Sequence, residues 1–299
     1  MSSFRSTLWS VVVLAALITG LLGWMAVRRG LAPLHAIKRE AAAITANRLH
    51  SRLPTDSIPV ELMDLAETLN QMLARLEDSF RRLSDFSSDI AHELRTPVSN
   101  LLTQTQVMLS RARTIDEYQD VLASNVEELE RMGKMIADML FLAKADNDLV
   151  VPHLEAVDLR AEAEGLASFY EAVAEENGVV LTIDGTATVS GDRLMLRRAM
   201  GNLLSNAFGH TPQGGYIRIL INTNANRMAT IQVENSGETI SPEHLPRLFD
   251  RFYRADPSRK RLTDGVGLGL AITRSIIQSH GGSVSAKSAD GVTVFKLQF

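Results

Sequence analysis

The feature that most constrains this chain is an uncharged apolar segment near its start, residues 8–27, with the sequence LWSVVVLAALITGLLGWMAV. A run of about 20 apolar residues is what a helix needs to cross a lipid bilayer. Trp9 and Trp24 lie near its two ends, as is typical of membrane interfaces. A signal peptide is disfavoured, because no A-x-A cleavage site ends the segment and Arg28 and Arg29 follow it. We therefore predict one transmembrane helix over residues 8–27.

The charges beside this segment predict its orientation. Only Arg5 precedes it, whereas Arg28, Arg29, Lys38 and Arg39 follow closely. Cationic residues accumulate on the cytoplasmic side of a membrane. The long C-terminal part of the chain is therefore expected in the cytoplasm.

Composition excludes several classes of protein. Only 5% of the 299 residues are aromatic, which favours several helical modules over one large core. The net charge of −4 gives no basic excess, so direct nucleic-acid binding is disfavoured. The absence of cysteine excludes disulfides, cysteine-based zinc sites and thiol nucleophiles.

Two short series of apolar residues at steps of three and four follow the apolar segment, separated by a polar connector that ends near Pro59. The first comprises Leu34, Ile37, Ala41 and Ile44, and the second Leu62, Leu65, Leu69, Met72 and Leu76. Two such helices cannot bury their seams alone, so a dimeric parallel four-helix bundle is expected. Residues 28–82 resemble a HAMP linker in position and periodicity.

The apolar alternation slips between Leu76 and Phe86, which we interpret as a junction between modules. Two long helices are predicted next, over residues 83–110 and 115–144, and they form a helical hairpin within residues 83–147. From about Pro152 helices alternate with strands. Helices are predicted over residues 162–177, 192–208 and 268–280, and strands at VVLTI, GYIRILINT, MATIQVEN, SVSAKS and VTVFKLQF. Residues 152–299 are therefore predicted to form a separate α/β sandwich.

The string AHELRTP places one histidine in a chemically specific setting. On a helix, His92 points away from the apolar direction shared by Ile90 and Leu94, so it is predicted to face solvent. Neutral imidazole is a good nucleophile, and the adjacent Glu93 could take up the released proton. An isolated histidine of this kind would more often be only a solvated side chain. Thr96 lies one turn further on, just before Pro97.

The segment from Ser87 to Leu102 resembles the phosphoacceptor box of HisKA sensor histidine kinases. This resemblance implies that His92 is phosphorylated and that Glu93 acts as base. It also implies that Thr96 orients the water that dephosphorylates a partner regulator. The hairpin would then be the dimerisation domain of the kinase, as a four-helix bundle in the homodimer.

A second group of residues is spread over the α/β region. Asn202 and Asn206 are one turn apart on a predicted helix, where their oxygens could ligate Mg²⁺, although a polar helix face or cap is an equal alternative. Asn235 and Gly237 follow a strand, and residues 264–276 form a glycine-rich turn that enters a helix. Such turns let the backbone approach a phosphate group.

In this order, and with LFDRFYRADPSRKR (residues 248–261) between the last two, these strings resemble the N, G and F boxes of the GHKL (Bergerat) ATP-binding fold. The resemblance implies that ATP and Mg²⁺ are bound, with Asn202 and Asn206 as metal ligands. Residues 254–263 resemble a mobile lid in which Arg254, Arg259, Lys260 or Arg261 could contact phosphate. The nucleotide-binding residues implied are Asn202, Asn206, His210, Asn235, Gly237, Phe249, Phe252, Arg254, Gly265, Gly267 and Gly269.

The whole pattern resembles a bacterial inner-membrane protein-histidine kinase. Such a two-component sensor phosphorylates itself from ATP, passes the phosphoryl group to an aspartate of a cognate response regulator, and dephosphorylates that regulator. The strings DMLFLAKADN and FDRFYRADPSR most resemble the copper- or silver-responsive branch, which implies a heavy-metal signal. Family members usually have an extracytoplasmic sensor before this span, so we expect that the sensor portion is absent here. A truncated chain, a misassigned start and a partner-controlled kinase are all left open.

Three positions depart from the family pattern. Asn235 stands where an aspartate is usual, Thr239 replaces a glycine, and Gly209 replaces a lysine or arginine. These changes leave a membrane-tethered pseudokinase, active only in dephosphorylation, as an alternative hypothesis. Another GHKL ATPase, such as a chaperone or DNA-topology enzyme, is disfavoured by the apolar segment and the HELRTP hairpin.

Overall fold

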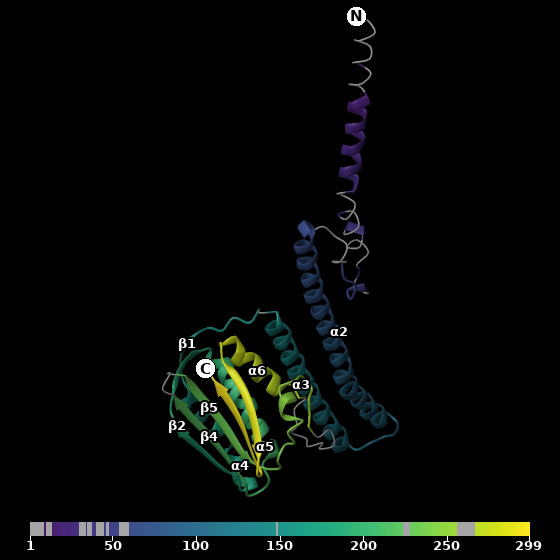
Figure 1. Cartoon of the computed structure of the whole chain (residues 1–299). Helices are drawn as coiled ribbons and strands as arrows, with labels where there is room; N and C mark the ends of the chain where they lie inside the picture. Colours follow the sequence, from purple (N-terminus) through teal and green to yellow (C-terminus); the bar gives the residue numbers. More distant parts are fainter. Residues whose placement is uncertain are drawn as a thin grey trace, which may run out of the picture. The chain divides into compact units, whose positions relative to one another are not determined.

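The computed structural model describes Trp9, Leu34, Thr45 and residues 14–29, 38–39, 48–53, 60–147, 149–223, 228–255 and 267–299. It divides into two compact units, Met1–Asp89 and Ile90–Phe299. Figure 1 shows the helices and strands in their order along the chain.

Residues 14–29 are helical, but none of the helices in the described ranges is both long and apolar enough to span a bilayer. The transmembrane helix predicted over residues 8–27 lies partly outside the described residues. Most of the first predicted helix of the HAMP-like linker, around Leu34 to Ile44, also lies outside them.

In the first unit, the described part of the polar connector, residues 48–53, packs through Leu53 against helix α2 (Val60–Leu109). The backbone of Leu53 pairs twice with the side chain of Asn70, at 2.8 and 3.1 Å. Leu53 is buried, as are Ala66 and Leu73 on the helix. The connector therefore covers one face of α2, whereas three residues of the predicted seam stay exposed: Leu65, Met72 and Leu76.

Helix α2 continues without a break through the predicted junction between Leu76 and Phe86. The helix predicted over residues 83–110 is thus the C-terminal part of α2, and the slip in periodicity does not end it. Helix α3 (Ile115–Asp146) begins with a capping box, in which Thr114 and Glu117 each accept a hydrogen bond from the other's backbone N–H. The two predicted hairpin helices and their short connection are confirmed.

The α/β domain contains two sheets. A five-stranded sheet has the order β2 (Val180–Gly185), β4 (Tyr216–Thr223), β5 (Ala229–Ser236), β7 (Val292–Gln298) and β6 (Ser283–Ala289). The β2–β4 pair is parallel and the other pairs are antiparallel. The smaller sheet pairs β1 (Glu155–Asp158) with β3 (Thr188–Gly191).

In the described part of this domain there are also three α-helices, α4 (Leu159–Asn177), α5 (Arg193–His210) and α6 (Gly269–Ser279), with a short 3₁₀ helix η2 (Leu245–Arg247). Helix α4 lies against β2, α5 against β5 and α6 against β6, so the helices form one layer over the sheet (Figure 1). Alternation along β4 buries Ile217, Ile219 and Ile221. This apolar layer holds the loops at the strand ends in place.

The N-terminus of α5 is fixed by Asp192. Its carboxylate accepts hydrogen bonds from the backbone N–H groups of Met195, at 3.0 Å, and His153, at 3.1 Å. Partial burial raises the pKa of Asp192, but hydrogen bonds from Met195, His153 and Leu194 outweigh it and hold the pKa below its ordinary value. The ionised form is therefore the one that stabilises the fold.

Asp192→Ala should lower the free energy of unfolding by about 1 kcal/mol at neutral pH, because two backbone donors lose their acceptor. Since the folded-state pKa is lowered, the contribution of Asp192 is present above its unfolded pKa and is lost as pH falls through the folded value. Urea unfolding at several pH values measures this. Asp192→Asn keeps an acceptor and should show no such pH dependence; equal stability of wild type and Asp192→Ala at neutral pH would contradict the capping role.

Candidate functional site

His92 is exposed on α2, as its helical phase predicts. Ile90 and Leu94 on the other side of the helix are half-buried, and Glu93 is half-buried beside the histidine. Thr96 is exposed one turn further on. The imidazole is thus accessible to a reactant, with a carboxylate and a hydroxyl close in the sequence.

Asn202 and Asn206 lie one turn apart on α5, and both are half-buried. The Asn202 side chain donates from Nδ2 to the backbone oxygen of Gly269, at 3.0 Å, where α6 begins. This bond joins the predicted N box to the glycine-rich turn. It leaves Oδ1 of Asn202 as an acceptor, and amide oxygens are suitable ligands for Mg²⁺.

The end of β5 meets the end of α5. Asn235 is buried, and its Nδ2 donates to the backbone oxygen of Ser236 at 3.2 Å. A Cβ atom added to Gly237 would lie 2.6 Å from the backbone oxygen of His210, a contact that side chains do not make. Only glycine therefore fits between these two predicted nucleotide-binding segments.

Thr239, one of the departures from the family pattern, has a defined partner. Its Oγ1 accepts a hydrogen bond from the backbone N–H of Gly291, at 2.8 Å, and Gly291 in turn accepts from the N–H of Gly237, at 2.8 Å. The β6–β7 turn thus supports the segment after β5. Gly291 is not among the residues predicted from the sequence; Asp290-Gly291 between two strands is a hairpin signal, but it cannot show which distant loop the turn contacts.

The predicted F box is a tightly held turn. Phe249 is buried and packs edge-on against Phe295, with ring centroids 6.2 Å apart. Phe252 adopts a positive φ of 58°, and its N–H donates to the oxygen of Gly267 at 3.0 Å. Gly267 also has a positive φ, 78°, and a Cβ there would lie 2.9 Å from the carbonyl carbon of Phe252. Gly267 is therefore a required glycine.

The structure brings most of the predicted nucleotide-binding residues to the loops around α5 and α6. Arg254, which follows the turn that contains Phe249 and Phe252, is half-buried, and His210 is exposed at the end of α5. Four predicted residues lie outside the described ranges: Gly265, Arg259, Lys260 and Arg261.

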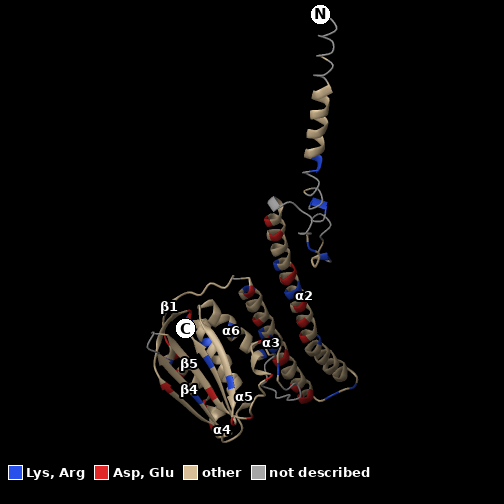
Figure 2. Ribbon diagram, in the orientation of Figure 1, with Lys and Arg blue, Asp and Glu red and all other residues tan. Residues whose placement is uncertain are grey.

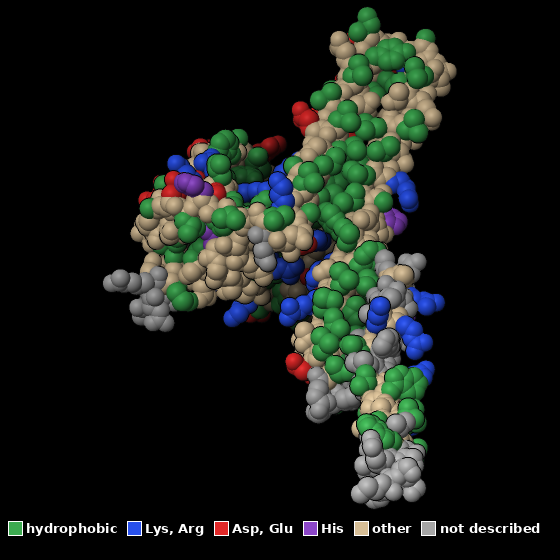
Figure 3. All heavy atoms as spheres, turned by 90° about the horizontal axis from the view of Figure 1, so that it is seen from above, with side chains coloured by type: hydrophobic (Ala, Val, Ile, Leu, Met, Phe, Trp, Pro, Cys, Tyr) green, Lys and Arg blue, Asp and Glu red, His purple; other side chains and the backbone are tan. Residues whose placement is uncertain are grey.

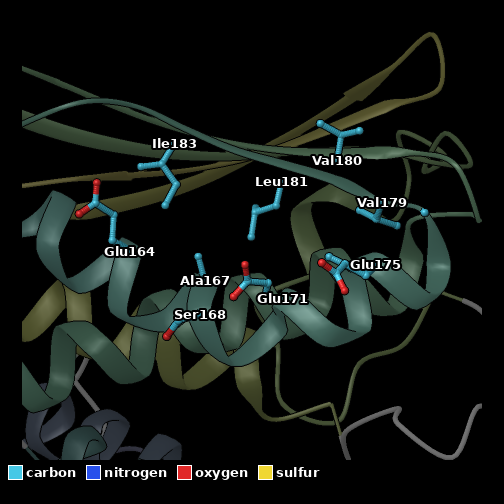
Figure 4. A pocket seen from close by; sticks show the side chains of 11 residues that line it. Glu164, Ala167, Ser168, Glu171, Glu175, Val179, Val180, Leu181 and Ile183 are labelled. Atoms are coloured by element: carbon cyan, nitrogen blue, oxygen red, sulfur yellow. The ribbon is translucent and has the colours of Figure 1, made fainter.

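A groove of about 600 Å³ lies elsewhere on the domain, between α4 and the edge strand β2 (Figure 4). Its apolar part includes Leu181 and Ile183, and its rim carries Glu164, Glu171 and Glu175. Among the residues that the structure describes, none of the predicted nucleotide-binding residues lines it. We therefore do not assign the nucleotide site to this groove.

The five-stranded mixed sheet under three helices, with paired asparagines on α5 and a glycine-held turn before α6, defines an ATP-binding domain. The preceding hairpin carries the exposed His92 beside the half-buried Glu93. Residues 191–299 match the family described as histidine kinase-, DNA gyrase B-, and HSP90-like ATPase. Residues 82–148 match the His Kinase A phospho-acceptor domain, and residues 25–78 match the HAMP domain.

The relatives are sensor kinases. The sensor histidine kinase CusS of Escherichia coli K12 is 49% identical over 265 residues, which cover 88% of this chain and 55% of CusS. The probable sensor protein PcoS of Escherichia coli is 45% identical over 281 residues, 94% of this chain and 60% of PcoS. Over most of its length the chain is thus similar to sensor histidine kinases of the HisKA/GHKL type, and it spans about half of the length of CusS.

One solved structure shows the same fold. The histidine kinase ThkA, solved in complex with the response regulator protein TrrA, aligns over 73% of this chain and 63% of that chain, with a TM-score of 0.59 and 22% sequence identity.

Proposed function

We propose that this chain is the signalling part of a two-component sensor kinase, which phosphorylates His92 from ATP and passes the phosphoryl group to an aspartate of a response regulator. The observation that carries the proposal is an exposed histidine, followed by a half-buried glutamate, on a hairpin attached to an ATP-binding domain. Glu93 is the proposed base, because it is adjacent to the imidazole and can accept the proton released on attack.

The described residues suit Mg-ATP. Asn202 and Asn206 would hold Mg²⁺, which would neutralise charge on the transferred phosphoryl group. Asn235 would accept from the adenine amino group through Oδ1, since its Nδ2 already donates to Ser236. Gly237 and Gly267 would let the backbone approach the nucleotide. Arg254 is a candidate phosphate contact.

A homodimer is part of the proposal. Helix α3 exposes a row of large apolar residues in the single chain, and Figure 3 shows hydrophobic side chains gathered along the helices. The row consists of Leu122 (61% exposed), Val126 (53%), Leu129 (56%) and Leu140 (59%). Such a surface requires cover by another helix. A second copy of the hairpin, forming a four-helix bundle, is the proposed cover.

The inner membrane is the proposed location, with the kinase domains in the cytoplasm. It is supported by the apolar segment at residues 8–27 and by the HAMP domain match. Copper or silver ions are the proposed signal, on the basis of the sequence resemblance.

A direct test incubates the purified chain with Mg²⁺ and ATP labelled at the γ-phosphate, and then adds a candidate regulator. Acid-labile, base-stable labelling of the chain, followed by transfer to the regulator, is expected. An unlabelled but folded and dimeric chain would contradict the kinase proposal.

Thr96→Ala should separate two activities, because Thr96 is exposed one turn from His92 and is neither the nucleophile nor the proposed base. Autophosphorylation should stay within about twofold of wild type, whereas dephosphorylation of the regulator should slow by about tenfold. Both rates are measured with labelled protein, and Thr96→Ser is the matched control that restores the hydroxyl. Equal loss of both activities would indicate a structural role for Thr96.

A further inference from the structure

Residues 249–253, here called the F-box turn, are anchored one by one to different elements. Phe249 packs on Phe295 of β7, with ring centroids 6.2 Å apart. The carboxylate of Asp250 pairs with Arg274 of α6, at 3.4 Å. Neighbouring residues of the turn are thus tied to the sheet and to the helix layer.

The other end of the turn is held equally closely. Phe252 donates to the backbone oxygen of Gly267 at 3.0 Å, as described above. The hydroxyl of Tyr253 lies 2.6 Å from Nδ1 of His244, and the guanidinium of Arg247 lies 4.4 Å from the Tyr253 ring centroid. Through the bond between Phe252 and Gly267, a displacement of the turn therefore displaces Gly267, which lies two residues before the start of α6.

Arg251 joins this turn to a helix outside the ATP-binding domain. It forms an ion pair with Asp146, the last residue of α3; the Arg251 side chain is half-buried and that of Asp146 is exposed. Helix α3 also packs beside α6 (Figure 1), with Met139 and Leu142 buried. The C-terminal turn of α3 is therefore connected through Arg251 to the nucleotide-binding loops.

A second ion pair joins α3 to the domain at a different place. Asp138 pairs with Arg198 of α5, and the Arg198 guanidinium lies 4.6 Å from the ring centroid of Phe141. Acidic and basic side chains both occur along α3 (Figure 2). The Asp138 pair holds the same helix against the same domain but does not involve the F-box turn, so it provides a matched comparison.

We propose that Asp146 is a positioning residue for nucleotide binding, which acts through Arg251 to fix the F-box turn and Gly267. The position of the end of α3 and the affinity for Mg-ATP are then coupled. Coupling between two sites is reciprocal, so bound nucleotide strengthens the Asp146–Arg251 contact by the same factor. This inference rests on the proposed function, because it assumes that the domain binds Mg-ATP.

The expected effect of breaking the Asp146–Arg251 ion pair on Mg-ATP affinity follows from how exposed the pair is. Exposed ion pairs contribute little by themselves; here Asp146 is exposed, and Arg251 is half-buried within a wider set of contacts. Asp146→Asn should weaken Mg-ATP binding about three- to fivefold. Asp138→Asn should leave the dissociation constant unchanged within about twofold.

The test uses the full chain in detergent or nanodiscs, with calorimetry for the Mg-ATP dissociation constant and labelled ATP for KM and kcat. Asp146→Asn should raise both the dissociation constant and KM, with the melting temperature of the nucleotide-free protein unchanged. Arg251→Gln should also weaken Mg-ATP binding. The double variant should bind Mg-ATP no less tightly than the single variant with the lower affinity, because both substitutions remove the same Asp146–Arg251 contact.

Three results would overturn the proposal: unchanged affinity in Asp146→Asn, equal weakening in Asp146→Asn and Asp138→Asn, or fully additive effects in the double variant. Equal weakening of Mg-ATP binding in the two variants would show that α3 stabilises the domain as a whole and does not act specifically through the F-box turn. A wild-type chain that does not bind Mg-ATP at all would overturn the proposed function and the coupling together, whereas wild-type binding with an unaffected Asp146→Asn variant overturns the coupling alone.

Discussion

His92→Gln is expected to reduce labelling from γ-labelled ATP to below about 1% of the wild-type level, because it removes the nucleophile of the proposed reaction. His92 is exposed on α2, so the amide side chain should be accommodated without a packing defect. Phosphorimaging after acid and base treatment measures the loss. Circular dichroism and gel filtration should show that the variant is folded and has the oligomeric state of the wild type.

The matched control for this experiment is His153→Gln. His153 is also exposed, and it makes its hydrogen bond to Asp192 through its backbone N–H, which the substitution keeps. Labelling of this variant should equal that of wild type. Persistent acid-labile labelling of His92→Gln would mean that another residue accepts the phosphoryl group.

Gly237→Ala is expected to weaken Mg-ATP binding by about tenfold or more. The added Cβ would lie 2.6 Å from the backbone oxygen of His210, so the segment after β5 or the end of α5 must move. Overpacking of this kind costs about 1–3 kcal/mol, and about 1.4 kcal/mol corresponds to a tenfold change in affinity. The dissociation constant can be measured by calorimetry or by displacement of a fluorescent nucleotide.

Gly201→Ala is the control for the same domain. Gly201 lies within α5, and a Cβ there would meet only Leu166, at the ordinary distance of 3.6 Å. It should leave nucleotide affinity unchanged and raise stability, since alanine is a better helix former by up to about 1 kcal/mol. Unchanged affinity in Gly237→Ala, with normal stability, would show that this contact does not shape the nucleotide site.

Local pattern was enough to predict much of the fold. Alternating apolar residues predicted all five strands of the large sheet, because a sheet with one covered face requires period-two burial. The helical phase of the HELRTP string predicted the exposure of His92. The strands β1 and β3 were not predicted, because four residues each are too few to show a period.

Where the helix of the second module begins also lay beyond local pattern. The slip in the apolar repeat predicts a junction between modules, but no helix starts there, because α2 is continuous from Val60 to Leu109. A shift in the apolar repeat changes which face of a helix packs against another helix, but it does not interrupt the backbone hydrogen bonds of the helix. The apolar period therefore indicates where the buried face of the helix changes, and it does not indicate where the helix begins or ends.

The sequence by itself determined which residue types could carry the chemistry: the histidine on its helix, the two asparagines one turn apart, and the glycines of the nucleotide loops. Only the tertiary structure decided how these segments meet. It placed Asn202 on Gly269, Gly237 against His210, Thr239 on Gly291, and Asp146 on Arg251. Each of these contacts joins residues far apart in the chain, and their partners are selected by packing of the sheet and helix layers, which no local repeat encodes.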